Sequence, residues 1–166
     1  GFEPDVDSSF ETAQVFDAEL ALDTPVEISD GFESINPEGD RDFYQLTVQK
    51  GEVYSLWTDA AHFAGEVILD TVLMVYNQDQ ELIATNDDMP YRWWETDSAV
   101  WFEATYDGHV YIEIRDWTDW PEGHTTSDPV ELGGGSDYTY QLWGARRSTT
   151  ELEPNDLAAA PDAPLA

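Results

Sequence analysis

Hydrophobic and polar residues alternate along much of this chain. In the segment 43–48, Tyr44, Leu46 and Val48 fall on one face of an extended backbone. A period of two residues is typical of a β-strand with one buried face, and the period of a helix is scarce here. The same reasoning, with turn residues as boundaries, predicts strands at 26–29, 43–48, 53–57, 71–76, 81–86, 98–105, 110–114 and 138–143.

Turn sequences separate these predicted strands at regular intervals. The polar tetrad at 77–80 joins two strands as a hairpin, and Asp107-Gly108 marks another turn. Seven or eight short strands with such spacing indicate an all-β fold, an antiparallel β-sandwich of jelly-roll type. The one helical candidate is a turn within residues 9–16.

The strand pattern stops near residue 145. We therefore expect one domain at 1–145 and a linker at 146–166, where alanine and proline dominate and the basic pair 146–147 is exposed to solvent. The opening word EPD at 3–5 returns almost unchanged as EPND at 153–156. The tail is thus expected to begin a second copy in a tandem array.

Acidic residues dominate the charge of the chain. There are 36 acidic and 6 basic residues, which gives a formal net charge of −30. Such a field repels nucleic acid and anionic membranes and attracts cations. No apolar run approaches the roughly 20 residues of a membrane span, and cysteine is absent. We expect no nucleic-acid partner, no membrane insertion, and stability that comes from the core and from bound metal.

Two acidic pairs have the spacing of ligands on an extended chain. Asp5 and Asp7 lie two residues apart, as do Asp40 and Asp42, so each pair can point to one side of a strand. Several converging carboxylates would repel one another without a cation, and calcium takes about six to eight oxygen ligands. The alternative is that turns favour aspartate for local hydrogen bonds.

A second acidic cluster follows from the register of the predicted hairpin. If Gln78 and Asp79 form its tip, Tyr76 faces Glu81 and Asp70 faces Asp87, with Asp88 adjacent. Opposed like charges are destabilising, so a cation or backbone amides would have to compensate them. Alternatively the strands splay into water at this end, and a register slip of one residue would separate the pair.

Four of the seven tryptophans lie in predicted loops. Loop aromatics beside polar groups suit the binding of sugar rings or of an extended peptide. The alternative is that they close the ends of the sandwich. The four ligand-contact candidates are Trp93, Trp94, Trp117 and Trp120.

The sequence offers little support for catalysis. The histidines His62, His109 and His124 stand in unrelated contexts, and neither a zinc-protease helix motif nor a serine-hydrolase elbow is present. Pairs of acids could serve a glycosidase, but the acids are so numerous that no single pair stands out. We expect a protein that is not an enzyme.

Five stretches within the first 143 residues carry a resemblance to a known family. In chain order they read EPDVDSSFETAQ, NPEGDRDFYQLTVQKGEVYSL, LDTVLMVYNQDQELIATNDD, SAVWFEATYDGHVYIEI and SDYTYQLW. In content, order and spacing they resemble the bacterial pre-peptidase C-terminal domain family, which includes the collagen-binding domains of clostridial collagenases. The resemblance implies a jelly-roll sandwich that accompanies the catalytic unit of a secreted protein, often in tandem copies.

The same resemblance implies a calcium site. Its ligands would come from the N-terminal acidic motif and from the segment GDRDFY. The family motif Glu-Pro-Asn-Asp is altered in this chain, which has Val6 at the last position of the motif. Because valine has no side-chain oxygen to bind a metal, the next residue, Asp7, is included as a substitute ligand. The implied metal ligands are Glu3, Asp5, Asp7, Asp40 and Asp42.

These observations lead to one function with two alternatives. The favoured function is a noncatalytic, calcium-binding accessory or targeting module of a secreted or cell-surface bacterial protein. It would bind an extracellular protein, a polysaccharide or a neighbouring domain of its own chain. One alternative is a structural spacer with no ligand beyond the metal, and a more distant one is a small glycosidase-like enzyme. Exposed loop tryptophans would favour the first function, and a deep cleft with two carboxylates the last.

Overall fold

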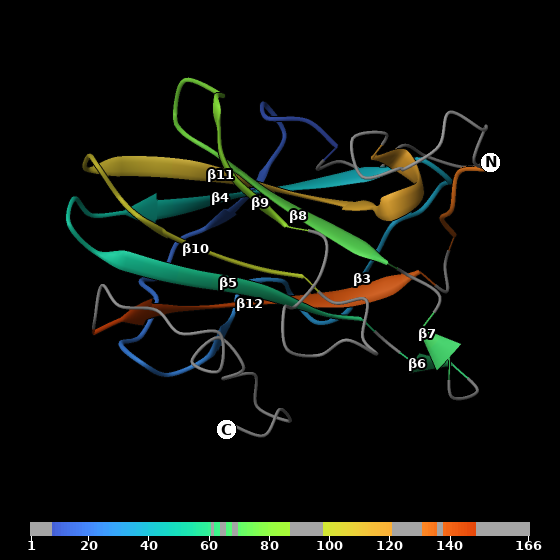
Figure 1. Ribbon diagram of the computed structural model, residues 1–166, viewed down its shortest axis with the longest axis horizontal. Helices are drawn as coiled ribbons and strands as arrows, with labels where there is room; N and C mark the ends of the chain where they lie inside the picture. Colours follow the sequence, from blue (N-terminus) through green and yellow to red (C-terminus); the bar gives the residue numbers. More distant parts are fainter. Residues whose placement is uncertain are drawn as a thin grey trace.

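A computed structural model describes residues 8–60, 62–63, 66–67, 70–86, 98–120, 131–135 and 138–148 of the chain. Over these residues two five-stranded β-sheets pack face to face (Figure 1). The predicted all-β sandwich is therefore confirmed. The strands are β1 (Gln14–Phe16), β2 (Val26–Glu27), β3 (Glu33–Ser34), β4 (Arg41–Val48), β5 (Val53–Ala60), β6 (His62–Phe63), β7 (Glu66–Val67), β8 (Thr71–Tyr76), β9 (Leu82–Asn86), β10 (Ala99–Glu103), β11 (Gly108–Asp116) and β12 (Thr139–Arg147).

Within each sheet, the spatial order of the strands differs from their order in the sequence. The first sheet has the order β1-β4-β11-β8-β9, and the second has β10-β5-β12-β2 with β3 also paired to β12. Neighbours are antiparallel except β1, which runs parallel to β4. β6 and β7 form a small sheet of their own. Consecutive long strands mostly cross from one sheet to the other, so the core between them depends on contacts distant in sequence.

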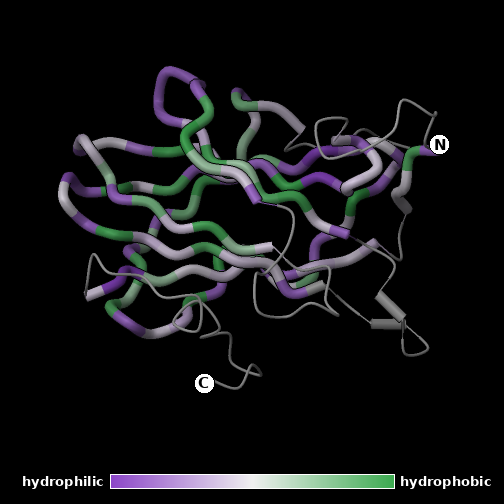
Figure 2. Tube along the Cα trace, viewed as in Figure 1, coloured by the Kyte–Doolittle hydropathy of each residue, from purple (hydrophilic) through white to green (hydrophobic). Residues whose placement is uncertain are grey.

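Side chains from both sheets fill the space between the layers. Tyr44, Leu46 and Val48 are buried, as their alternation predicts, and so are Val100 and Phe102 on β10. Figure 2 shows apolar and polar positions alternating along the strands that carry them. Since apolar burial contributes about 25 cal/mol per Å² removed from water, this interior is the main source of stability.

The predicted helical turn within 9–16 is wrong. The structure has a turn in which Thr12 N donates to Ser9 O at 3.3 Å, and then the short strand β1. Its residues pair with the segment of β4 from Tyr44 to Leu46. The local sequence is neutral, and the backbone partner offered by β4 decides the conformation.

The predicted register of the β8–β9 hairpin is also wrong. Tyr76 faces Leu82 rather than Glu81, and the register shifts between Val75 and Tyr76. The turn takes one more residue than predicted, with Gln80 at a φ of 65°. The described pairs thus follow a register other than the one from which the pairing of Asp70 with Asp87 was predicted. Asp87 and Asp88 themselves lie outside the described residues.

The last strand continues past the predicted domain boundary. Arg146 and Arg147 belong to β12 and pair with Tyr54 and Val53, so their predicted place in a solvated linker is wrong. Arg146 Nε also donates to the carbonyl of Leu20 at 2.7 Å. Residues 149–166, including the predicted start of a second copy, lie outside the described part. No helix in the described ranges is long and apolar enough to cross a membrane.

Candidate functional site

Two of the predicted calcium ligands lie at the start of β4. Asp42 points into the sandwich, because it shares the inward face of the strand with Tyr44, and only 1% of it is exposed. Asp40 precedes the strand and is 8% exposed. Glu3, Asp5 and Asp7 lie outside the described residues. The structure thus buries both acids of the second predicted pair at one end of the sandwich.

A chain of hydroxyl groups holds the carboxylate of Asp42. Tyr140 donates its hydroxyl proton to Asp42 Oδ2 at 2.6 Å, and the hydroxyl of Tyr44 lies 2.8 Å from that of Tyr140. Because Tyr140 gives its one proton to Asp42, Tyr44 is the donor in the second bond. Burial, together with the negative charge of Asp42, raises the pKa of Tyr140 well above its ordinary 10.0.

Alkaline pH should weaken the fold through its buried tyrosines. The pKa values of Tyr54, Tyr76, Tyr106 and Tyr140 are all raised, mainly by burial. Above about pH 10 the unfolded chain therefore holds fewer protons than the folded one, and stability falls as pH rises. We expect the midpoint of urea denaturation to fall between about pH 9 and 11, with a shallower fall in Tyr140→Phe. A midpoint that does not change over this range would contradict the expectation.

Asp116 fixes the loop that carries two of the candidate tryptophans. Its Oδ2 accepts from the backbone N and the hydroxyl of Thr118, and so caps the short 3-10 helix η1 (Trp117–Asp119). Its Oδ1 accepts from Asp70 N at 3.2 Å. Gly133 N in turn donates to Thr118 Oγ1 at 2.7 Å. Sequence reasoning missed this residue, although aspartate is one of the residues favoured at the N-cap of a helix.

The two described tryptophans of the predicted ligand set are half-buried. Trp117 N donates to the carbonyl of Asp70 at 2.6 Å, and Trp120 N donates to that of Trp117 at 3.0 Å. Each of these residues is thus partly accessible and partly packed against this end of the sandwich. Trp93 and Trp94 lie outside the described residues.

A buried charge network lies on the outer face of the first sheet. Glu113, 2% exposed, accepts from Arg115 Nε at 2.7 Å and from the hydroxyl of Tyr76 at 2.6 Å. Arg41 makes two hydrogen bonds to Asp119, at 2.7 and 3.2 Å. The hydrogen bond to Asp119 raises the pKa of Arg41. Sequence reasoning missed the network, because one buried glutamate is not distinguishable among so many acids.

An aromatic cluster lies on the same outer face of this sheet. The ring centroid of Phe10 lies 4.8 Å from that of Phe43, 5.0 Å from that of Tyr76 and 5.2 Å from that of Tyr111. Aromatic pairs at such distances add about 0.5–1.5 kcal/mol beyond their buried area. Phe10 therefore anchors the chain to the sheet three residues after the predicted metal motif at 3–7.

The described residues alone do not complete a metal site. Among them, no group of three or more histidine, cysteine or acidic side chains is arranged to hold an ion. Asp40 and Asp42 supply carboxylate oxygens, which are the ligand type that calcium prefers. A site at this end would therefore need further oxygens from the predicted ligands at 3–7.

Comparison with known proteins gives a structural match and no sequence match. No protein-family model and no curated protein matches the sequence. The fold is similar to that of a pre-peptidase C-terminal domain. That domain, from a Bacillus anthracis collagenase, is 12% identical, with a TM-score of 0.45 over 80% of this chain and 95% of the other. The periplasmic inhibitor of g-type lysozyme from Aeromonas hydrophila, PliG, is 10% identical, with a TM-score of 0.42 over 81% and 98% of the two chains.

Proposed function

We propose that this domain is a noncatalytic binding module of a secreted or cell-surface bacterial protein, and that calcium stabilises the end where β4 begins. The observation that carries the proposal is the burial of Asp40 and Asp42 within two residues of each other. Buried carboxylates are costly in free energy unless charge and hydrogen bonds compensate them. Calcium would supply positive charge there and link β4 to the acidic motif at 3–7.

The ligand set follows from the sequence resemblance and from these two positions. Asp40 and Asp42 would provide carboxylates from β4, and Glu3, Asp5 and Asp7 would provide the others. The function of such a site is structural, because the metal would fix the entry of the chain beside the sheet. The binding partner would be an extracellular protein, a polysaccharide or a neighbouring domain.

Calcium is expected to raise the melting temperature. A ligand that binds only the folded state stabilises it by about 2.7 kcal/mol when its free concentration is ~100 times its dissociation constant. Thermal melting would be measured in millimolar calcium and in excess chelator at fixed ionic strength. Asp42→Asn should reduce the calcium-dependent shift, whereas Asp30→Asn, at an exposed aspartate, should leave it unchanged. Equal melting temperatures of the unsubstituted protein in both buffers would overturn the calcium proposal.

A further inference from the structure

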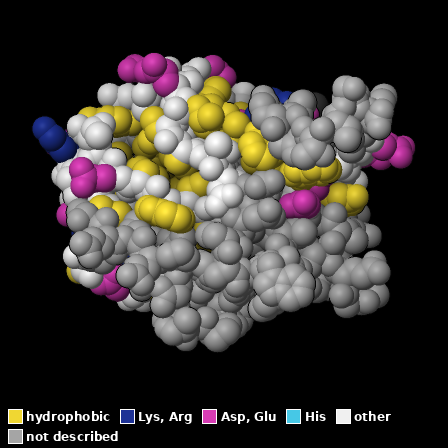
Figure 3. Space-filling model, viewed as in Figure 1, with side chains coloured by type: hydrophobic (Ala, Val, Ile, Leu, Met, Phe, Trp, Pro, Cys, Tyr) yellow, Lys and Arg dark blue, Asp and Glu magenta, His cyan; other side chains and the backbone are white. Residues whose placement is uncertain are grey.

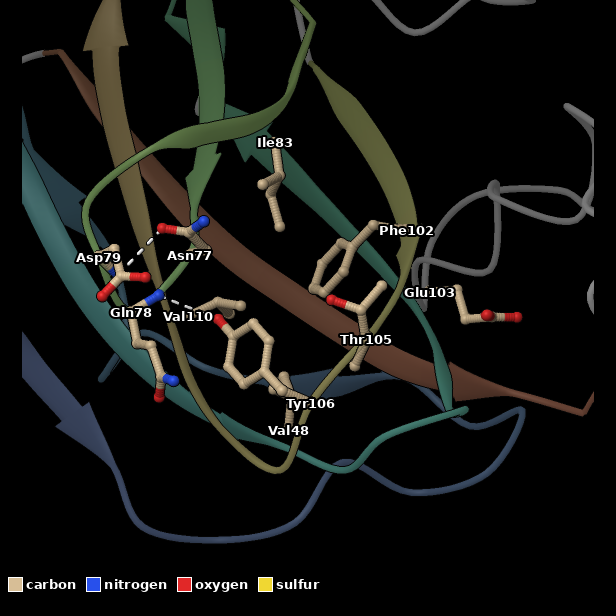
Figure 4. A pocket seen from close by; sticks show the side chains of 11 residues that line it. Val48, Asn77, Gln78, Asp79, Ile83, Phe102, Glu103, Thr105, Tyr106 and Val110 are labelled. Carbon is tan, nitrogen blue, oxygen red and sulfur yellow. Dashed lines mark hydrogen bonds between the residues drawn. The ribbon is translucent and has the colours of Figure 1, made fainter.

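A cavity opens where the edges of the two sheets separate. β9 and β10 are the terminal strands of their sheets in the described part, and Asn86 Nδ2 joins them by donating to the carbonyl of Ala99 at 3.0 Å. Beyond this contact, the hairpin turn at 77–80 and the segment after β10 surround a cavity of about 300 Å³ (Figure 4). The chain thus leaves an opening into the side of its own sandwich.

The inner wall of this cavity is part of the hydrophobic core. It is lined by Val48, Phe102 and Val110, which are all buried members of the hydrophobic core between the sheets. Ile83 stands at the mouth with 45% of its surface exposed. Figure 3 shows hydrophobic side chains gathered on this face of the molecule, with acidic side chains at its margins. An occupant would therefore have to place an apolar segment against the inner wall.

Two of the polar side chains around the cavity, those of Asn77 and Tyr106, are already engaged. The hydroxyl of Tyr106 accepts from Gln78 N at 3.0 Å and donates to the carbonyl of His109 at 2.8 Å. The side-chain oxygen of Asn77 accepts from the backbone N of Asp79 at 3.0 Å and from that of Glu81 at 2.9 Å. These bonds hold the rim in shape and leave these groups with little capacity for a ligand.

The carboxylate of Asp79 remains available at the rim. It is exposed, and in the described part of the chain no side chain or backbone amide donates a hydrogen bond to it. A carboxylate only accepts hydrogen bonds, so its complement is a donor, and a positively charged donor binds it most strongly. No basic residue lines the cavity. The available chemistry is therefore an apolar wall that ends in a negative charge.

We propose that this cavity binds a lysine side chain of a partner polypeptide. The four-carbon stem of lysine would pack on Ile83 and Phe102, and its ammonium group would reach Asp79, in the arrangement by which lysine buries its stem and exposes its charge. The net charge of −30 would steer a basic partner towards this face. A sugar fits less well, because those of its hydroxyls that turn towards the apolar inner wall would find no hydrogen-bond partner there. The inference rests on the proposed role as a binding module and names the class of partner.

The test is a titration of the ¹⁵N-labelled protein with short peptides, followed by NMR. One glycine-serine peptide carries a single lysine, and its counterpart carries norleucine, which keeps the stem and lacks the charge. A third carries arginine, and a chito-oligosaccharide represents the polysaccharide alternative. We expect saturable shifts of the amides at Gln78, Asp79, Thr105 and Tyr106 with the lysine peptide, and binding about fivefold weaker for norleucine.

Matched variants test which carboxylate of the cavity binds the lysine peptide. Asp79→Asn should weaken binding of the lysine peptide about fivefold. Glu103→Gln removes the same charge from a residue whose carboxylate points away from the cavity in Figure 4, and it should change binding by less than about twofold. Thr105→Trp, which narrows the mouth with no change of charge, should abolish the shifts. All three positions are exposed, so we expect the variants to fold.

Each outcome decides the proposal. Equal binding of the lysine and norleucine peptides, equal effects of Asp79→Asn and Glu103→Gln, or shifts away from the cavity would overturn it. Tighter binding of the oligosaccharide than of the lysine peptide would assign the cavity to a sugar instead, and tighter binding of the arginine peptide would replace lysine by arginine. Titrations in calcium and in chelator separate this result from the calcium proposal, since the cavity lies among residues outside the predicted metal ligands.

Discussion

Arg115→Met is expected to lower the free energy of unfolding by about 3–5 kcal/mol. The substitution leaves Glu113 buried with its principal cation removed, while its hydrogen bond from Tyr76 remains. An uncompensated buried charge is among the most costly defects in a folded protein, and a domain of this size has a total stability of about 5–15 kcal/mol. Urea denaturation followed by tryptophan fluorescence measures the loss.

Two further variants make this result specific. Lys50→Met removes an exposed cation of the same charge and should change the stability by less than about 0.5 kcal/mol. The double variant Arg115→Met with Glu113→Leu removes both charges and should recover a large part of the loss, because no buried charge is left unpaired. A loss below about 1 kcal/mol for Arg115→Met alone would show that the ion pair behaves like a surface pair.

Leu56→Ala is expected to cost about 2–5 kcal/mol. Leu56 is fully buried between the sheets and packs against Gly144 of the neighbouring strand. Removing its side chain deletes apolar contacts and leaves a cavity that a two-sheet core closes only partly. The same denaturation experiment gives the value, and a cost under about 1 kcal/mol would mean that the core rearranges to fill the space.

Gly144 offers a test of how tightly this part of the core is packed. A Cβ placed there would lie 2.9 Å from methyl carbons of Leu20, Ile28 and Leu56. Gly144→Ala alone should therefore be destabilising by overpacking. Combined with Leu56→Ala, which removes one of the three obstacles, it should cost less than the sum of the single effects. Strict additivity would indicate that the side chains do not share the same space.

The strands were predictable where two conditions are met: apolar and polar residues alternate along the segment, and recognisable turn sequences lie on both sides of it. The segments around Tyr44 and Val100 fulfil both conditions, and their inward faces are the ones that alternation predicts. β1 was not predictable, because its extended conformation depends on pairing with β4, which lies far along the chain. The hairpin register failed for a local reason. Gln80 adopts a positive φ that is uncommon outside glycine, and this lengthens the turn.

The candidate site was predictable only in part. Asp40 and Asp42 were identified from spacing and resemblance, and the structure buries both. The buried roles of Glu113 and Asp116 depend on partners in other strands and loops, which the sequence does not reveal. One signal was present, since Glu113 and Arg115 lie two residues apart in a predicted strand and so share a face. An acid and a base on one strand face could have been interpreted as an ion pair.

The ion pairs of this domain also restrict how endopeptidases can attack it. Enzymes that cleave after lysine or arginine need an accessible, extended segment around the basic residue. Arg41, Arg115, Arg146 and Arg147 all lie in strands, and each pairs with an acid. Of the basic residues that the structure describes, Lys50 lies exposed in the tight turn between β4 and β5, whereas Arg41, with 42% of its side chain exposed, is held within its strand. The contacts that stabilise the sheets therefore also withhold the described arginines from trypsin-like enzymes.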